Sequence, residues 1–349
     1  MSYARTGTFY GTVAVVRDMV RILDAIGGDG LLRFHGASYG TVLGWTFAQM
    51  FPERVERMLL NGNVNNVEWW NGYEVARGKD TDKVFQNLLQ GCVDSQGKCK
   101  LAELGDVDTI RSKLEAKLGS LTDGQAASFK AMIYNNLYHP STWSEVVTKL
   151  YALIENGVLS KRELVKRELV KRELDRGDPV QCSDFRFRAN TASELATLAQ
   201  TQNPLDWFHF QQGSAWNCYA WQFDAVERFE NAGRLPPAKT KNPVLLVNPT
   251  WDPVTPLANA HNNSLWLERS VVLEHRGNGH GTDDLQKSRC TYQAMRDYFV
   301  DLKMPDRGAV CDVDVQLFSD DNSMTVLKPL YEEAGFEVQD DGTLKYLSK

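Results

Sequence analysis

Residues 31–41 read LLRFHGASYGT, and this stretch decides the fold. The apolar run Leu31–His35 predicts a short strand, and the amphipathic segment Thr41–Phe51 predicts a helix soon after it. Between them, Gly36–Gly40 matches the pattern G-x-S-x-G, in which a serine occupies a tight turn from strand to helix. Such a turn holds the Ser38 hydroxyl at the positive end of the following helix, so the pattern predicts Ser38 as a nucleophile.

The neighbouring segments extend this unit on both sides. A second apolar run, Val55–Leu60, follows the helix, and strand, helix and strand in this order predict a parallel sheet with a right-handed crossover. Val13–Ile26 has apolar residues at helical spacing and ends at two glycines. Further along the chain, Val244–Val247 and Ser270–Leu273 predict two more strands, and Ser288–Leu302 predicts a closing helix.

The segment between these two groups of strands has a different pattern. It lacks alternating strands and helices, and four amphipathic helices are predicted in it: Asp82–Leu89, Val107–Leu118, Gln125–Leu137 and Ser141–Glu155. We therefore expect an α/β fold with about four parallel strands. Its predicted parts are residues 1–66, the core with Ser38; 67–237, a helical insertion; 238–311, the rest of the core; and 312–349, an acidic, weakly patterned tail.

Within the insertion, residues 161–174 read KRELVKRELVKREL, a repeated five-residue unit. Glu163 precedes Arg167 by four residues, which supports an exposed helix. A five-residue period advances by about 140° per repeat, so the leucines do not share a face and a coiled coil is not expected. We interpret the repeat as a duplicated stretch in a tolerant surface loop, with a docking helix as the alternative.

Composition narrows the range of partners. The 349 residues include 39 Lys and Arg against 45 Asp and Glu, which gives a net charge of −6 and a pI near 5.6. A nucleic-acid-binding domain needs a net basic face, so no nucleic-acid partner is expected. Since no run approaches 18 consecutive apolar residues, no membrane-spanning helix is expected either.

The cysteines and the first residues point to different compartments. The six cysteines are Cys92, Cys99, Cys182, Cys218, Cys290 and Cys311. An even number fits three disulfides in an oxidising compartment, and six buried thiols are the alternative. Residues 1–12, MSYARTGTFYGT, show no signal peptide.

A serine hydroxyl needs a base before it can attack. In the fold that carries this turn, the chain order is serine, then acid, then histidine. Asp252 follows the strand that ends at Val247, and His280 lies in a glycine-rich loop after the next strand. Both side chains therefore project from the carboxyl ends of strands, where functional groups of α/β sheets gather. His275 is the nearest rival, but it is expected inside or at the end of a strand, so Ser38, Asp252 and His280 are the predicted triad.

With these residues, the sequence resembles the tripeptidyl/prolyl aminopeptidase group of α/β-hydrolases, the secreted type with a TAP-like C-terminal domain. The resemblance runs from about Thr8 to Cys311. The segments that carry it are Val16–Ile26, Gly36–Phe51, Pro52–Leu60, Asp252–Pro256 and Gly279–Gly281. It implies an α/β-hydrolase fold, a helical lid over the site, and release of single residues or short peptides from a free N-terminus.

The resemblance also implies a role for each residue. Ser38 is the expected nucleophile, Asp252 the acid that orients the histidine, and His280 the general base that passes the Ser38 proton to the leaving amine through an acyl-enzyme. The main-chain N–H of Tyr39 is one expected oxyanion donor. The family also implies secretion and three disulfides: Cys92–Cys99, Cys182–Cys218 and Cys290–Cys311.

The sequence departs from the family at its start. Family members carry early strands and a glycine-rich loop that supplies a second oxyanion donor, but no HGG or GGPG stretch precedes Ser38 here. We therefore expect an N-terminally truncated sheet in which Leu31–His35 is an open edge. The family's Asp-Gly after the second strand becomes Asn61–Gly62. Three explanations stay open: a truncated sequence, a non-catalytic relative, and an enzyme completed by a partner chain, of which the first two are favoured.

The function predicted from these observations is a serine hydrolase, an exopeptidase acting on peptide N-termini. The first alternative is a hydrolase or acyl transferase for a small ester, lactone or amide in a fungal metabolite pathway, and the second is a non-catalytic remnant. An acidic, amine-binding cluster in the lid favours the peptidase, whereas an aromatic pocket built from Trp69, Trp207 or Trp216 favours the small ester. No cofactor or metal is expected, because the sequence has no H-E-x-x-H, C-x-x-C or phosphate-binding loop.

Overall fold

The computed structural model describes most of the chain. The described residues are 6–72, 74–157, 179–185, 188–189, 191–194, 207–208, 218, 221–320, 323–333, 336–339 and 344–346. The repeat at residues 161–174 and Trp216 lie outside these ranges.

The centre of the molecule is a parallel sheet of five strands in the order β1-β2-β3-β4-β5. The strands are β1 Leu32–Ala37, β2 Val55–Asn61, β3 Leu245–Trp251, β4 Val271–Asn278 and β5 Val310–Asp312. The predicted α/β class is confirmed. The expected number of about four strands was too low, since β5, only 3 residues long, pairs with β4. A strand this short shows no period in the sequence.

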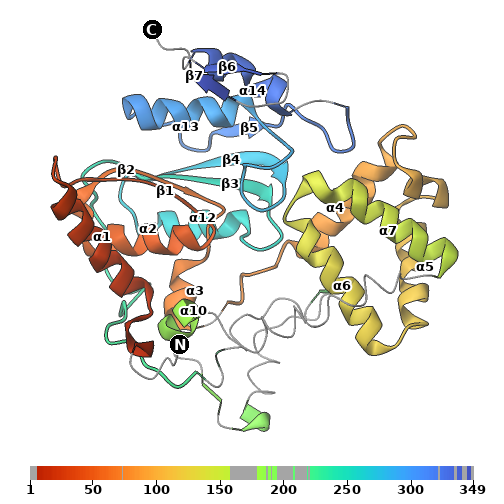
Figure 1. Ribbon diagram of the computed structural model, residues 1–349, viewed down its shortest axis with the longest axis horizontal. Helices are drawn as coiled ribbons and strands as arrows, with labels where there is room; N and C mark the ends of the chain where they lie inside the picture. The colour runs from red at the N-terminus through yellow and green to blue at the C-terminus, as the bar shows by residue number, and fades with distance from the viewer. Residues whose placement is uncertain are drawn as a thin grey trace.

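Helices cover both faces of the sheet (Figure 1). The helices α1 Thr12–Ile26, α2 Tyr39–Met50 and α12 Leu257–Ser264 lie on one face, and α13 Arg289–Asp301 lies on the other. Apolar side chains of β2 and β3 alternate between these layers: Met58, Leu60 and Leu246 pack toward the first, Leu59 and Leu245 toward the second. This alternation follows from the two-residue period of a strand buried on both faces.

A group of four helices lies beyond one end of the sheet (Figure 1). These are α4 Thr81–Val93, α5 Val107–Gly119, α6 Asp123–Leu137 and α7 Trp143–Asn156. They have their own apolar core, which includes the fully buried Phe85, Ile133 and Leu150. The predicted helical insertion therefore forms a packed lid unit, while α3 Asn66–Asn71 and α10 Pro179–Asp184 lie closer to the sheet.

Single 3-10 turns complete the helical structure: η2 Gly7–Phe9, η3 Pro52–Arg54, η4 Lys100–Leu104 and η5 Pro140–Thr142. Within the described ranges, no helix combines the length and the apolar composition needed to cross a bilayer.

The three implied disulfides are confirmed. Cys92–Cys99 closes the end of α4, Cys182–Cys218 fastens α10, and Cys290–Cys311 joins α13 to β5. Their Cα–Cα distances are 5.2, 4.9 and 5.5 Å, within the normal range for a disulfide. The last bridge holds the short strand β5 at the edge of the sheet.

The tail is more ordered than its sequence pattern predicted. Residues after 312 form the helix α14 Ser323–Glu333 and an antiparallel pair, β6 Phe336–Val338 and β7 Leu344–Tyr346. Leu327 of α14 is 1% exposed, and α14 lies against α13. The sequence of the tail is weakly patterned because a single buried face on a short helix gives too few repeats to be recognised.

Candidate active site

The turn between β1 and α2 holds Ser38 in a strained backbone conformation. Its φ is 54° and its ψ is −122°, which a residue with a Cβ adopts only under constraint. The Ser38 N–H donates to the carbonyl of Asn61 at 3.0 Å, and the Ser38 carbonyl accepts from the Thr41 N–H at 2.8 Å. The hydrogen bonds to β2 and to the first turn of α2 therefore hold Ser38 in this strained conformation.

The glycines of the motif have unequal roles. A Cβ on Gly36 would lie 2.4 Å from the carbonyl oxygen of Gly40, so only glycine fits there. A Cβ on Gly40 would meet no atom within 4 Å, so Gly40 is not required by close packing. Instead, the strand and helix approach each other at Gly44, where a Cβ would lie 2.7 Å from Leu60. The sequence pattern correctly marked the first glycine and missed Gly44.

Asp252 lies directly after β3 and is fully buried. Its Oδ1 accepts from the N–H groups of Val254 and Thr255 at 2.9 and 2.8 Å. Its Oδ2 accepts from the Thr255 hydroxyl at 2.8 Å and the Gly281 N–H at 3.1 Å. Burial alone raises the pKa of a carboxyl, but the charge of His280 and these hydrogen bonds hold the pKa of Asp252 below its usual value.

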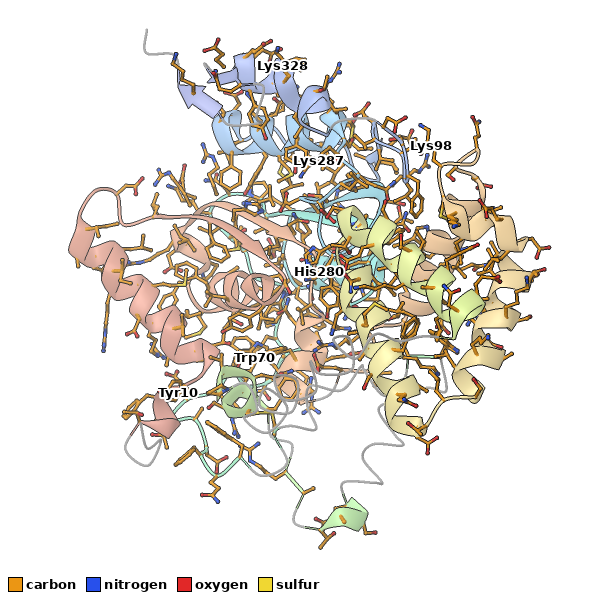
Figure 2. The ribbon with its side chains drawn as sticks, turned by 45° about the vertical axis from the view of Figure 1, so that its right-hand side comes forward. Tyr10, Trp70, Lys98, His280, Lys287 and Lys328 are labelled. Atoms are coloured by element: carbon orange, nitrogen blue, oxygen red, sulfur yellow. A yellow bond between two sulfur atoms is a disulfide. The ribbon has the colours of Figure 1, made fainter. Side chains whose placement is uncertain are left out.

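His280 follows β4 and faces this carboxylate. Its Nδ1 lies 3.0 Å from Oδ2 and 3.2 Å from Oδ1 of Asp252, and 3.1 Å from the Thr255 hydroxyl. Figure 2 shows His280 near the centre of the molecule, where the lid helices meet the sheet. Burial lowers the pKa of the imidazole, but the Asp252 carboxylate outweighs burial and leaves the pKa raised.

The rival histidine has a different environment. His275 lies within β4, is 1% exposed, and its Nδ1 lies 2.9 Å from the Thr291 hydroxyl. Burial lowers the pKa of His275 to about 4, so this side chain is neutral at physiological pH. Its surroundings are those of a histidine that supports packing between β4 and α13.

A cavity of about 300 Å³ opens at Ser38. Ser38 and Tyr39 line it from the turn, Val254 and Thr255 from the Asp252 loop, and Tyr138 from the lid. Thr255 and Tyr138 also contact His280, so the Asp252–His280 pair lies behind two residues of the cavity wall. Tyr39 is the first residue of α2, which places its main-chain N–H at the positive end of that helix.

Charged side chains form another wall of this cavity. Glu68, Glu74 and Arg77 line it. Glu74 pairs with Arg77 at 3.0 Å and accepts from the Gln181 amide at 3.2 Å. Burial raises the pKa of Glu68, even though the Ala76 N–H donates to its Oε2 at 2.8 Å. Sequence reasoning missed these residues, because no motif or spacing sets them apart from surface charges.

Of the three tryptophans that would favour the small-ester alternative, the structure describes Trp69 and Trp207. Trp69 lines the cavity, with its ring 5.7 Å from that of Tyr39. Trp207 stacks on Phe85 at 5.1 Å in the lid core instead. No group of three or more His, Cys, Asp or Glu suited to a metal occurs in the described part of the chain.

A serine on a strained turn after a parallel strand, with its acid and histidine on loops after later strands, defines an α/β-hydrolase. Within this chain, residues 203–311 match the family model described as TAP-like protein. The matched segment contains Asp252 and His280, and the family resemblance of the sequence is thereby confirmed.

The chain is also similar to serine protease Hip1 of Mycobacterium bovis and of two strains of Mycobacterium tuberculosis. In each case it is 29% identical over 164 residues, which cover 42% of this chain and 31% of the relative. The match therefore spans less than a third of the length of these curated relatives.

Proposed function

We propose that this protein is a serine hydrolase of the peptidase type. The observation that carries the proposal is the 3.0 Å contact between His280 Nδ1 and the buried Asp252 carboxylate, beside the cavity that Ser38 lines. The similarity to a serine protease supports it. Ser38 attacks the substrate carbonyl, and His280 takes its proton and then protonates the leaving group. Water then attacks the acyl-enzyme, and His280 takes a proton from this water and returns it to Ser38.

Asp252 keeps its charge throughout this cycle. Its oxygens accept four hydrogen bonds from Val254, Thr255 and Gly281 in addition to His280, so it favours the Nδ1–H tautomer and stabilises the imidazolium. The tetrahedral oxyanion forms at the positive end of α2, where the Tyr39 N–H is the proposed donor.

The charged wall supports an exopeptidase acting on free N-termini. Glu68 and Glu74 bring two carboxylates to the Ser38 cavity and Arg77 brings one positive charge, so the wall has an excess of negative charge. Burial disfavours the ionised form of Glu68 in the empty site, and the positive charge of a substrate ammonium bound beside it would favour that form. The acyl group released would thus carry a free amine.

A second candidate is a hydrolase for small esters. The rings of Tyr39 and Trp69, 5.7 Å apart and tilted by 46°, offer an apolar surface beside Ser38. This surface suits an acyl group without charge.

Fluorophosphonate labelling of the full chain tests the hydrolase proposal. We expect labelling that Ser38→Ala abolishes, because the probe needs a serine activated by a base. The labelling rate should fall as pH drops through the raised pKa of His280, since only neutral imidazole accepts the proton. A folded chain that does not label would contradict the proposal.

Matched peptide substrates with free and acetylated N-termini test the exopeptidase detail. We expect Glu68→Gln to lower kcat/KM for free-amine substrates by about 10–100-fold, the loss of one charged hydrogen bond, and to leave acetylated substrates unchanged. Glu155→Gln, an exposed residue of α7, is the control. Faster cleavage of short esters than of any peptide would favour the second candidate.

A further inference from the structure

The turn between the lid helices α6 and α7 lies directly on the loop that carries His280. The His280 N–H donates to the carbonyl of Tyr138 at 2.8 Å. On the other side of the turn, the Ser141 N–H donates to Asp284 Oδ2 at 3.1 Å. The lid and the histidine loop are therefore joined by hydrogen bonds on both sides of Pro140.

The two segments approach each other more closely than most side chains would permit. Gly279 has a φ of 102°, and a Cβ there would lie 2.5 Å from Pro140 Cδ and 3.1 Å from the Tyr138 carbonyl oxygen. Glycine is thus required next to His280 by the lid itself. The glycine-rich sequence of this loop therefore has a packing cause at Gly279.

The lid turn is itself well braced. The indole N–H of Trp143 donates to the carbonyl of Asn136 at 3.1 Å, and Trp143 is 1% exposed. The carbonyl of His139 accepts from both the N–H and the hydroxyl of Thr142 at 2.8 Å. A braced turn can hold the histidine loop in one position, which an isolated loop would not do.

The side chain of Tyr138 completes this contact. Its ring meets the imidazole of His280 edge to face, with centroids 5.2 Å apart and planes at 74°. The same side chain lines the cavity with Ser38. It therefore contacts both the substrate space and the base, and covers part of the imidazole, whose Nδ1 is held by the Asp252 carboxylate.

We propose that Tyr138 is a further positioning residue of this site, through which the lid orients His280 and sets its exposure to water. The inference rests on the proposed function for its catalytic meaning. The charged groups that influence His280 are Asp252 on the β3 loop and Arg77 before α4, and Arg77 also hydrogen-bonds the Tyr138 side chain. Comparing Tyr138→Phe with Tyr138→Ala therefore separates the loss of this hydrogen bond from the loss of the ring.

The test follows the His280 imidazole by NMR titration in the full chain with Ser38→Ala, so it does not depend on activity. The His280 resonance is assigned by its loss in His280→Ala. We expect Tyr138→Ala to raise the His280 pKa by about one unit, because water would replace the ring and stabilise the imidazolium. Tyr138→Phe keeps the ring and should return the pKa to the wild-type value. Tyr151→Ala, on α7 of the same lid, should leave it unchanged.

In the chain with Ser38 present, Tyr138→Ala should lower the fluorophosphonate labelling rate by about 10–100-fold, as expected when a base is misplaced. If Tyr138→Ala fails to fold, Asp284→Ala removes the Ser141 anchor and should change both readouts in the same direction by a smaller amount. An unchanged His280 pKa in a folded Tyr138→Ala or Asp284→Ala chain would overturn the proposal. A wild-type chain that titrates as expected but does not label would contradict the proposed function alone.

Discussion

Asp184 is a buried carboxyl that the proposed reaction does not use. It accepts from the Thr12 N–H at 2.8 Å, the Thr12 hydroxyl at 2.5 Å and the Trp69 indole at 2.9 Å. The Thr12 hydroxyl also contacts the Tyr39 hydroxyl at 2.8 Å, so this carboxyl supports two residues of the cavity wall. Burial raises the pKa of Asp184 to about 6 despite these hydrogen bonds.

The raised pKa predicts a pH-dependent stability. A carboxyl with a higher pKa in the folded state stabilises the fold below its unfolded pKa of 3.8, and this stabilisation is lost as pH rises through about 6. Its size is about 3 kcal/mol of unfolding free energy. The side chain in Asp184→Asn stays neutral at every pH. We therefore expect the free energy of unfolding of the wild type, minus that of the variant, to fall by that amount between pH 4 and 7, as measured by urea unfolding. Asp108→Asn, exposed on α5, is the control, and a flat difference for Asp184→Asn would contradict the assignment.

A motif singles out candidate residues in the sequence, whereas other residues of the cavity are brought together only by the fold. Ser38, Asp252 and His280 were recognisable because each follows a strand in a required order. Glu68 lies in α3 and Tyr138 directly after α6, far apart in the sequence, in segments whose pattern reports only a buried face. No local signal indicates that such side chains meet at one cavity.

At the scale of elements, the turn between β1 and α2 depends more on Gly36 than on Gly40. We expect Gly36→Ala to prevent folding or to abolish fluorophosphonate labelling, because its Cβ would lie 2.4 Å from the Gly40 carbonyl, an overlap of rigid backbone atoms. Gly40→Ala is the matched control. Gly40 lies in α2 with open space around its Cα, so alanine should stabilise the helix by about 0.5–1 kcal/mol.

Thermal unfolding and labelling of both variants check this prediction. Equal loss in both variants would mean that the motif needs its second glycine for a reason other than close packing. Normal folding and labelling of Gly36→Ala would show that β1 and α2 can separate without cost.

The long elements were predictable and the short ones were not. The helices Thr12–Ile26 and Trp143–Asn156 agree with the predicted ranges to within about two residues, the usual uncertainty of helix ends. The helix Leu257–Ser264 and the strand Val310–Asp312 were missed, because two turns of helix or three strand residues give no clear period. The strand Val310–Asp312 is held by the disulfide Cys290–Cys311, a constraint that the hydrophobic pattern of the sequence does not report.

At the scale of the whole molecule, the lid and the sheet have separate cores that meet at the candidate site. Leu150 belongs to the core of α4–α7, and Leu246 belongs to the core between the sheet and α1, α2 and α12. Their main contacts around His280 are the turn at Tyr138–Ser141 and the cavity itself. The sequence predicted a helical insertion, but this junction joins residues about 140 positions apart, which periodicity does not detect.

Because the lid and the sheet have separate cores, we expect them to unfold locally as two units. Leu150→Ala leaves a cavity in the lid and should cost about 2–5 kcal/mol, so hydrogen exchange should rise in α4–α7 and in the His280 loop while β2 and β3 stay protected. Leu246→Ala, the matched change in the sheet core, should raise exchange in β2 and β3. Fluorophosphonate labelling should fall in the Leu150→Ala chain, because a loosened lid no longer holds Tyr138 against His280. Exchange that rises equally in lid and sheet for both variants would mean that the chain unfolds as one unit, and the lid could not then adjust the base independently of the sheet.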